Sequence, residues 1–518
     1  MHESFPHCAD FLDSQGLSPL IIDGSTLSIS NLIDVARRKR RVSLSGLVEQ
    51  RLVASRNLVE KIVQGKSLVY GINTGLGDLS NTTISKDQTV QLQTNLIRSH
   101  AVGVGSLFSE DVVRAFMLLQ ANKLSRGNSG VPIEAVNVIL DCLNANIHPL
   151  VPSQGSLGAS GDLAPLAHAA LVYIGEGKAH LGNVVLTGKE ALKAKGIQPL
   201  KLEPKVGLSL LNGTEVSTAL AALAVHDAQI ITDSSLVAGA MTLEAAEGSE
   251  VPFSEAIHQL RPHPGQIRAA RALRFLLRES QITISHSDAH KIQDPYSLRC
   301  MPQVIGASCT VIDHCKDVIQ IELNSVTDNP LVFAEDEVVL SGGNFHAQPI
   351  ALAMDYLKTA VAEVANISER RIYLLLDSHR SGLPHFLARS PGLESGLMIA
   401  QNVAAALVSE NKVLSHPASV DSIPTSAGME DHVSMAPIAA RQVMQIIDNT
   451  CNVVALELLV ASQGLSFSKG LNPGKGVMDA LEHVRKVSPV IEFDRSTSGD
   501  VEKLSRLIKS GVFSGLIP

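Results

Sequence analysis

The sequence predicts a mainly α-helical protein whose centre is a bundle of long helices. Long windows carry apolar residues at steps of three and four, which is the spacing of one face of an amphipathic helix. Stretches with strand-like alternation are few and short. Aromatic residues make up only 3% of the chain, which agrees with an α-rich protein. These three observations set the expected fold class.

The N-terminal part, residues 1–205, is expected to be rich in loops. Its basic cluster at 38–41 predicts a solvated helix end, because no second cluster or interleaved aromatic residue supports a phosphate-binding patch. The glycine-containing stretches 71–79 and 101–108 lack the third glycine and the strand-to-helix context of a nucleotide-binding loop, so they predict tight turns. Alternating residues at 180–187 predict short strands.

The central part, residues 206–470, is expected to form the helical bundle. Residues 354–364 predict an amphipathic helix, and 330–340 predict short strands beside turn residues. Three segments that are longer or more apolar predict buried helices of the bundle: 215–243, 397–412 and 435–463. The polar tail, residues 471–518, is expected to pack on the bundle, and no internal repeat or long polar linker divides the chain.

Charge and composition argue against several classes of protein. The chain has 43 basic and 51 acidic residues, and this net charge of −8 argues against general nucleic-acid binding through phosphate neutralisation. No uncharged apolar stretch reaches the roughly 18 residues of a membrane span. Residues 1–12 lack the basic region and apolar run of a signal peptide, so the cytoplasm is the expected location. Charged residues make up only 18%, which predicts that much surface is buried in an oligomer.

Cysteine and histidine patterns predict no metal site. The 6 cysteines are scattered without a C-x-x-C pair, so neither a disulfide framework nor a zinc ribbon is indicated, and a reducing compartment fits. His286 and His290 have the i, i+4 spacing of a helical zinc motif, but the glutamate of H-E-x-x-H and a third ligand are missing. We therefore expect these to be ordinary histidines.

Residues 155–168, GSLGASGDLAPLAH, place three small residues side by side before an acid and a helix-like run. Ser160 lacks the G-x-S-x-G elbow of a serine nucleophile. A different chemistry follows from its neighbours, because Gly161 has the least hindered backbone nitrogen and Ala159 offers a small carbonyl neighbour. Attack of that nitrogen on that carbonyl, with loss of water including the serine hydroxyl, would leave an exocyclic alkene. Such a group is an electrophile that no ordinary side chain provides.

This stretch resembles the signature of the aromatic amino acid ammonia-lyases, whose Ala-Ser-Gly becomes a methylidene-imidazolone (MIO) group. Other blocks are similar to the same family at appropriate intervals: YGINTGLG (70–77), NLIRSHAVGVG (95–105), LLNGTE (210–215), QDPYSLRCMPQV (293–304), GGNFHAQP (342–349) and SAGMEDHVSM (426–435). The resemblance implies a long-helix bundle of the aromatic amino acid lyase (fumarase/aspartase-like) type, with MIO formed from residues 159–161 and no diffusible cofactor. It also implies a homotetramer in which each active site is assembled from more than one subunit.

The resemblance also implies roles for single residues. Tyr70 matches the tyrosine that takes the β-proton of the substrate, and a phenol with an ordinary pKa of about 10 must be activated for that task. Arg299 matches the residue that holds the substrate carboxylate through two parallel charge-assisted hydrogen bonds. Further matches orient the carboxylate, the amine and the MIO oxygen or line the MIO chamber: Asn212, Gln293, Tyr296 and Phe345. Taken alone, Tyr70 could be a tyrosine hydrogen-bonded in a turn, and Asn212 and Gln293 could be turn caps.

Substrate choice in the family depends on two positions, which here are Ser99-His100 and Glu430. Members that act on histidine carry Ser-His and Glu, whereas those that act on phenylalanine or tyrosine typically carry a bulky or ring-contacting pair and Gln. An imidazole offers one N–H donor and one acceptor, so a carboxylate and a histidine can meet its two sides. The resemblance thus implies conversion of L-histidine to trans-urocanate and ammonia, the first step of histidine breakdown. Without it, His100 would be a surface histidine and Glu430 an acid at a helix N-terminus.

Three positions depart from the usual family pattern. Leu76 stands where relatives usually have Phe, Glu215 where Gln is usual, and Gly428-Met429 where Asn-Gln is common. None of these changes removes a catalytic group, although they could reshape the pocket. Two alternatives therefore stay open. One is a lyase or 2,3-aminomutase acting on tyrosine or phenylalanine, and the other is a silent family member with a binding or structural role.

Overall fold

The computed structural model describes residues 17–65, 68–75, 84–85, 88–285, 293–468 and 470–518, and this part of the chain is mainly α-helical, as the sequence predicts. The chain divides into two compact units. The first unit comprises 1–223, 317–352 and 418–440, and the second comprises 224–316, 353–417 and 441–518. The division at 205 and 470 remains a prediction from the sequence.

Long helices supply residues to both units. They are α9 (Glu215–Ala245), α14 (Met301–Glu322), α15 (Gln348–Leu376) and α18 (Ala436–Leu465). Two of them, α9 and α18, together with α17 (Met398–Leu414) confirm the predicted helices at 215–243, 397–412 and 435–463. The predicted amphipathic helix at 354–364 lies within α15.

Shorter helices build most of the first unit. They are α1 (Ile29–Arg38), α2 (Gly46–Gln64), α3 (Thr89–His100), α4 (Glu110–Leu124), α5 (Ile133–Asn144), α6 (Leu163–Tyr173), α7 (Gly188–Ala194), α8 (Val206–Leu211) and the short 3-10 helix η5 (Ser426–Gly428). Helix α4 contacts α1 and α5 and is buried on all sides from Val112 to Leu124. A helix in that position must find partners for its own charged residues, because water does not reach them.

Small antiparallel pairs and one parallel pair of strands complete the first unit. Strand β1 (Leu20–Ile22) pairs parallel with β2 (Val42–Leu44), and β3 (Val104–Leu107) pairs antiparallel with β5 (Pro152–Gln154). Strands β4 (Ile147–Pro149), β6 (Lys178–Leu181) and β7 (Val184–Thr187) form one antiparallel sheet, and β8 (Leu331–Phe333) pairs with β9 (Val338–Leu340). The hairpins β6–β7 and β8–β9 confirm the strands predicted at 180–187 and 330–340.

The predicted solvated helix end at 38–41 is also confirmed. Helix α1 ends at Arg38, and Lys39 follows in the left-handed region with φ of 59°. The Arg38 side chain is 57% exposed and pairs with Asp34 one turn earlier, and Lys39 pairs with Glu110. Basic residues at a helix C-terminus complement the negative end of the helix dipole.

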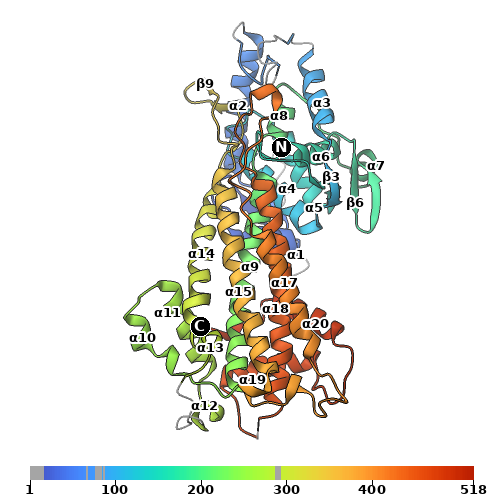
Figure 1. Ribbon diagram of the computed structural model, residues 1–518. Helices are drawn as coiled ribbons and strands as arrows, with labels where there is room; N and C mark the ends of the chain where they lie inside the picture. The colour runs from blue at the N-terminus through green and yellow to red at the C-terminus, as the bar shows by residue number, and fades with distance from the viewer. Residues whose placement is uncertain (1–16, 66–67, 76–83, 86–87, 286–292, 469) are drawn as a thin grey trace, which may run out of the picture. The chain divides into compact units, whose positions relative to one another are not determined.

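The second unit is a bundle in which α9, α14, α15, α17 and α18 lie side by side (Figure 1). Ser308 Oγ of α14 donates to Ala360 O of α15 at 2.9 Å, and Asn411 Nδ2 of α17 donates to Thr450 Oγ1 of α18 at 3.2 Å. In the interior, the fully buried Arg371 guanidinium makes a bidentate pair with Glu457 at 2.5 and 2.7 Å. Such pairs fix the register of packed helices, because breaking them strands a charge in the core.

Smaller elements surround this bundle within the second unit. They are η3 (Val251–Phe253), α10 (Glu255–Gln259), α11 (Pro264–Leu276), α12 (Gln281–Ser285), α13 (Tyr296–Arg299), α16 (Ser378–Ser381), η4 (His385–Leu387), α19 (Lys475–Val487), α20 (Ser498–Lys509) and η6 (Ser514–Leu516). Ser505 Oγ of α20 donates to Asn452 Oδ1 of α18 at 2.8 Å. This bond and an ion pair between Lys509 and Asp448 hold the C-terminal segment on α18.

One helix in the described part of the chain, α18, has the length and apolar composition of a membrane span. However, 72% of its most apolar window is buried inside the protein. Core helices of large bundles meet the same criterion of length and composition. The burial of α18 therefore fits a core helix.

Candidate active site

The centre of the candidate site is a tight turn formed by residues 158–161. The Gly161 N–H donates to Gly158 O at 3.3 Å, and Ser160 adopts the left-handed region with φ of 52°. For a residue other than glycine this conformation is unfavourable, so it persists only where the surroundings impose it. The tripeptide that the sequence singles out thus has an unfavourable backbone conformation at its central residue.

A second glycine, Gly213, presses against this turn from the other side. The Asp162 N–H donates to Gly213 O at 2.7 Å, and the Gly213 N–H donates to Ser160 O at 3.3 Å. A Cβ atom at position 161 would lie only 2.0 Å from Gly213 O, so no side chain fits there. The close approach of two backbones thus requires glycine at 161 and holds Ser160 in its strained conformation.

The segment before α18 closes the turn on a further side. The Met435 N–H donates to Leu157 O at 3.0 Å. A Cβ atom at Gly158 would lie 2.3 Å from Ser434 Oγ, so here a side chain packs directly against the backbone of the turn. The turn is therefore held between residues 213 and 434–435, which are far apart in the sequence.

Packing of three helices within the first unit brings further predicted residues to this region. Helices α3, α6 and α8 contact one another. Helix α6 begins directly after the turn, α8 ends directly before Asn212, and α3 ends at His100. Three helices that adjoin predicted site residues are thus packed against one another.

Glu430 is held in a fixed direction by its own loop. Its Oε2 atom accepts hydrogen bonds from Thr425 Oγ1 at 2.7 Å and Ser426 Oγ at 2.6 Å. Its Oε1 atom accepts from Ser160 Oγ at 3.3 Å. Glu430 lies between η5 and α18, so it is not an acid in the first turn of a helix. The carboxylate is thus anchored on one oxygen and directed at the candidate electrophile with the other.

His100 is half-buried at the end of α3 rather than a freely exposed surface histidine. Its Nδ1 lies 3.1 Å from Ser99 Oγ. Burial lowers the pKa of His100, while its hydrogen bond to the backbone of Leu96 and the negative charge of Glu430 act in the opposite direction. A lowered pKa keeps the imidazole neutral near pH 7, so it retains one donor and one acceptor.

The remaining predicted residues of the first unit have different surroundings. Tyr70 is half-buried in a turn. Asn212 is buried and its side-chain amide donates to Asn329 O at 3.0 Å, so in this structure it supports the 328–329 segment. Phe345 is half-buried between β9 and α15, and the next residue, His346, stacks on His432 with ring centroids 5.7 Å apart. This stacking ties the segment of Phe345 to that of Glu430.

Gln293, Tyr296 and Arg299 belong to the second unit. The Arg299 guanidinium lies 4.4 Å from the centre of the Tyr296 ring, and Tyr296 is 69% exposed. Gln293 is exposed as well, whereas Asp294 between them is buried and accepts a hydrogen bond from Ser249 N at 2.7 Å. These three predicted residues therefore form a polar group on and next to α13.

Several features predicted from the sequence lie outside the described residues. They include residues 76–79 of the 71–79 glycine stretch, with Leu76 among them, and both His286 and His290. In the 101–108 stretch the predicted tight turn is wrong, because residues 104–107 form β3; Gly105 lies inside this strand, where the pairing with β5 is irregular, and its φ of 87° favours glycine. Gly428 also has positive φ, 88°, and Met429 is 60% exposed, so this departure from the family pattern alters the surface of the loop that carries Glu430.

Sequence reasoning missed a set of buried charges beneath the turn. Lys123 forms an ion pair with Glu215, and Lys205 pairs with Asp328 at 2.8 Å, with every one of these side chains at most 3% exposed. The signal that could have revealed Lys123 is the mainly apolar run at 112–121 just before it, because a charge on a buried helix must be paired. The glutamate at 215, where relatives usually have glutamine, is thus accommodated because a lysine pairs with its charge.

Asp162 is a further residue that the sequence did not single out. It is fully buried and accepts hydrogen bonds from the backbone N–H and the hydroxyl of Ser217, both at 2.7 Å. Burial raises the pKa of Asp162 to about 7, with the nearby charge of Glu215 acting in the same direction and the Ser217 bonds opposing it. The residue that follows the turn thus supplies an acceptor for the free N–H groups at the start of α9.

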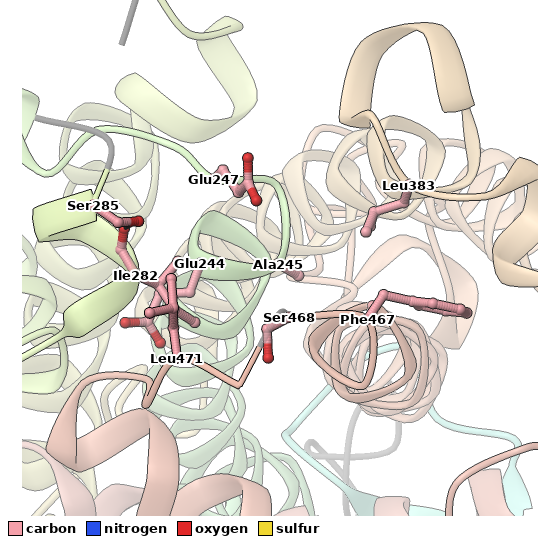
Figure 2. A pocket seen from close by; sticks show the side chains of 10 residues that line it. Glu244, Ala245, Glu247, Ile282, Ser285, Leu383, Phe467, Ser468 and Leu471 are labelled. Carbon is pink, nitrogen blue, oxygen red and sulfur yellow. Dashed lines mark hydrogen bonds between the residues drawn. The ribbon is translucent and has the colours of Figure 1, made fainter. Parts of the chain in front are cut away.

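No group of three or more His, Cys, Asp or Glu side chains that could hold a metal ion occurs among residues 17–518 outside the masked gaps named above. A separate pocket of about 220 Å³ lies in the second unit and is lined by residues of α9, α12 and α18, by the segments that follow α9 and α18, and by Leu383 after α16 (Figure 2). Glu244 in its wall is buried and accepts from Gly474 N at 2.7 Å. The pocket contains none of the predicted site residues.

Comparison with known proteins identifies the family of this chain. The model of the family described as aromatic amino acid lyase matches residues 27–486. The chain belongs to the aromatic amino acid lyase family. A histidine ammonia-lyase of Alkaliphilus oremlandii is 48% identical over 495 residues, covering 96% of this chain and 97% of the relative. A histidine ammonia-lyase of Gloeobacter violaceus is 49% identical and covers 95% of this chain and 96% of the relative.

Solved structures of aromatic amino acid lyases and aminomutases share the fold. The crystal structure of histidine ammonia-lyase from Trypanosoma cruzi has a TM-score of 0.90 at 40% identity, covering 97% of this chain and 96% of that chain. A tyrosine aminomutase from Streptomyces globisporus has a TM-score of 0.92 at 36% identity, covering 96% and 98%. The predicted fold type of the aromatic amino acid lyases is thereby confirmed.

The raised pKa of Asp162 predicts how stability depends on pH. The unfolded carboxyl ionises near its ordinary pKa of 3.8, whereas the folded one keeps its proton up to about pH 7. Ionisation therefore favours the unfolded chain, and the stability contributed by this group falls as the pH rises from about 4 to about 7. We expect the melting temperature of the wild type to fall more steeply over this range than that of Asp162→Asn. Differential scanning calorimetry at several pH values would measure the melting temperatures. Asp336→Asn, which removes an exposed carboxyl of the same unit, is the control, and its melting temperature should change with pH as that of the wild type does. Parallel slopes for the wild type and Asp162→Asn would contradict the assignment.

Proposed function

We propose that this member of the family is a histidine ammonia-lyase, which eliminates ammonia from L-histidine to give trans-urocanate. The observation that carries the proposal is the Glu430 carboxylate, held by Thr425 and Ser426 and directed at Ser160. A carboxylate in that place accepts the N–H of an imidazole ring. The names of the two curated relatives at 48% and 49% identity support the same substrate.

The residues of the strained turn fit an MIO group. In the proposed cyclisation, the Gly161 nitrogen forms a bond to the carbonyl carbon of Ala159. One water leaves with the oxygen of Ala159, and a second leaves with the hydroxyl and α-hydrogen of Ser160. Gly161 lacks the side chain that would hinder this attack, and the positive φ of Ser160 closes the turn that the reaction must join.

When formed, the MIO group supplies an electrophile that turns the substrate amine into a better leaving group. The chain's own residues would do the rest. Tyr70 would take the β-proton, and Arg299 would hold the carboxylate with help from the other predicted binding residues, Asn212, Gln293, Tyr296 and Phe345. Glu430 and His100 would hold the two imidazole nitrogens and so orient the β-carbon toward the base.

The same carboxylate disfavours phenylalanine. A benzene ring has no N–H group to donate to Glu430. Leaving the carboxylate without this donor costs about 1–3 kcal/mol of binding free energy. The structural similarity to a tyrosine aminomutase keeps a 2,3-aminomutase as the alternative activity. Assays of the purified protein with histidine, tyrosine and phenylalanine, with detection of β-isomers, separate the two, and preference for tyrosine would contradict the proposal.

We also propose a cytoplasmic homotetramer with active sites shared between subunits. Exposed apolar side chains on α17 support an interface on the bundle: Ile399 at 56%, Val403 at 44% and Val413 at 72% exposure. An exposed tyrosine beside an arginine on α13 likewise fits a surface that another subunit completes.

The mass of the intact chain tests the electrophile. We expect the active protein to be lighter than its encoded sequence by two water molecules, because cyclisation expels both. Ser160→Ala, which has no hydroxyl to lose, should not show this loss and should not turn over histidine. Intact-mass spectrometry checks both chains, and an active wild type of full encoded mass would rule out the MIO mechanism.

The Glu430→Gln variant tests the specificity residue. It keeps the shape of the side chain but removes the charge, so turnover of histidine should fall by at least about tenfold. Spectrophotometry of urocanate formation measures the rate. Glu335→Gln, which removes an exposed charge in the β8–β9 turn of the same unit, should keep the wild-type rate. Full histidine activity of Glu430→Gln would show that the residue is only structural.

Mixing two inactive variants tests the shared site. Ser160→Ala disables the turn, and Arg299→Ala disables the proposed carboxylate-binding residue. If one site takes Ser160 and Arg299 from different subunits, co-expression restores up to about a quarter of the wild-type activity, because that share of sites receives both intact residues. No recovery in mixed oligomers confirmed by tagged co-purification would place both residues in one subunit's site.

A further inference from the structure

The buried ion pair between Lys123 and Glu215 has no role in the proposed reaction. Lys123 comes from helix α4, which is buried from Val112 to Leu124, and Glu215 is the first residue of α9. Their side chains are 2% and 3% exposed, and the ammonium contacts the carboxylate directly. Burying two charges is costly even when they are paired, so apolar residues of similar volume would serve stability at least as well. Their presence calls for an account beyond stability.

Lys123 binds more than its partner acid. Its Nζ donates to Asn212 O at 2.7 Å and to Ser209 O at 3.2 Å. Together with the Glu215 carboxylate these carbonyls give the ammonium three acceptors, one for each of its three hydrogens. A single buried cation thus ties together both ends of the segment 209–215.

That segment is the wall against which the strained turn is pressed. Gly213 within it bonds to Ser160 O and receives the Asp162 N–H. Glu215 packs so closely behind Gly213 that a Cβ atom on this glycine would lie 2.4 Å from Glu215 Oε2. A displacement of the pair would therefore move Gly213 and release the turn.

We propose that Lys123 and Glu215 are positioning residues for the backbone cyclisation at 159–161. They hold Gly213 in place, Gly213 holds Ser160 in the left-handed region, and the closed turn brings the Gly161 nitrogen toward the Ala159 carbonyl carbon. Neither residue touches the reacting atoms in this scheme. The inference rests on the proposed function, because it concerns the formation of the MIO group.

The rate of maturation tests the pair. In Lys123→Met, the two carbonyls and the carboxylate lose their donor, and the turn should cyclise at least about tenfold more slowly. Each chain is made by cell-free synthesis, and intact-mass spectrometry follows the fraction that has lost two waters over time. Circular dichroism and size-exclusion chromatography select folded protein for every measurement.

A double variant separates positioning from stability. Lys123→Met combined with Glu215→Gln leaves no unpaired charge in the core, so folding should recover. Maturation should remain slow, because the carbonyls of Ser209 and Asn212 still lack the ammonium. This variant also keeps the test decisive if Lys123→Met alone does not fold.

Lys358 provides a matched control in the second unit. This lysine is also fully buried, pairs with Asp355 at 2.7 Å, and donates to His416 O and Gln442 Oε1. We expect Lys358→Met to lower the melting temperature while its folded chains mature at the wild-type rate. Equal slowing in Lys358→Met, or a wild-type rate in the double variant, would overturn the inference. A wild type that never loses two waters would instead overturn the proposed function.

Discussion

The close approach of two backbones, at Gly161 and Gly213, is the constraint on which the rest of the candidate site depends. A Cβ atom at position 161 would lie 2.0 Å from Gly213 O, so this carbonyl can occupy its place only because residue 161 lacks a side chain. The contact fixes Ser160 in a conformation that an isolated peptide would avoid. The energy of that strain is supplied by packing elsewhere in the first unit, which explains why a reactive turn requires a large and rigid scaffold.

Charges buried in pairs provide part of that rigidity. Lys123 and Lys205 bring two positive charges beneath the turn, and Glu215 and Asp328 bring two negative ones. Ion pairs of this kind contribute little net stability, but a misplaced partner is strongly unfavourable. They therefore favour one backbone conformation of the surrounding segments over similar alternatives. A reaction between two backbone atoms needs such a fixed conformation.

Much of the fold could be predicted from the sequence, because helical periodicity is a local property. The bundle helices end within two residues of the bounds expected for 215–243, 397–412 and 435–463. Local motifs likewise pointed to the turn and to Glu430. The Lys123–Glu215 contact joins residues 92 positions apart, and the acceptor that Asp162 provides for α9 joins residues 55 apart. Neither has a periodic or motif signal, so only the folded structure could reveal them.

The hydrogen bond from Ser160 to Glu430 has a consequence for the order of events in the life of the enzyme. Before cyclisation, the serine hydroxyl occupies the Oε1 acceptor on which an imidazole N–H would later depend. In the proposed maturation that hydroxyl departs as water. Glu430 Oε1 is therefore occupied in the chain before cyclisation, and the same step that forms the electrophile frees it to accept an imidazole N–H. The ability to bind the imidazole ring and the ability to react with the substrate would thus arise together. A subunit that has not yet cyclised would not bind histidine and withhold it from active subunits.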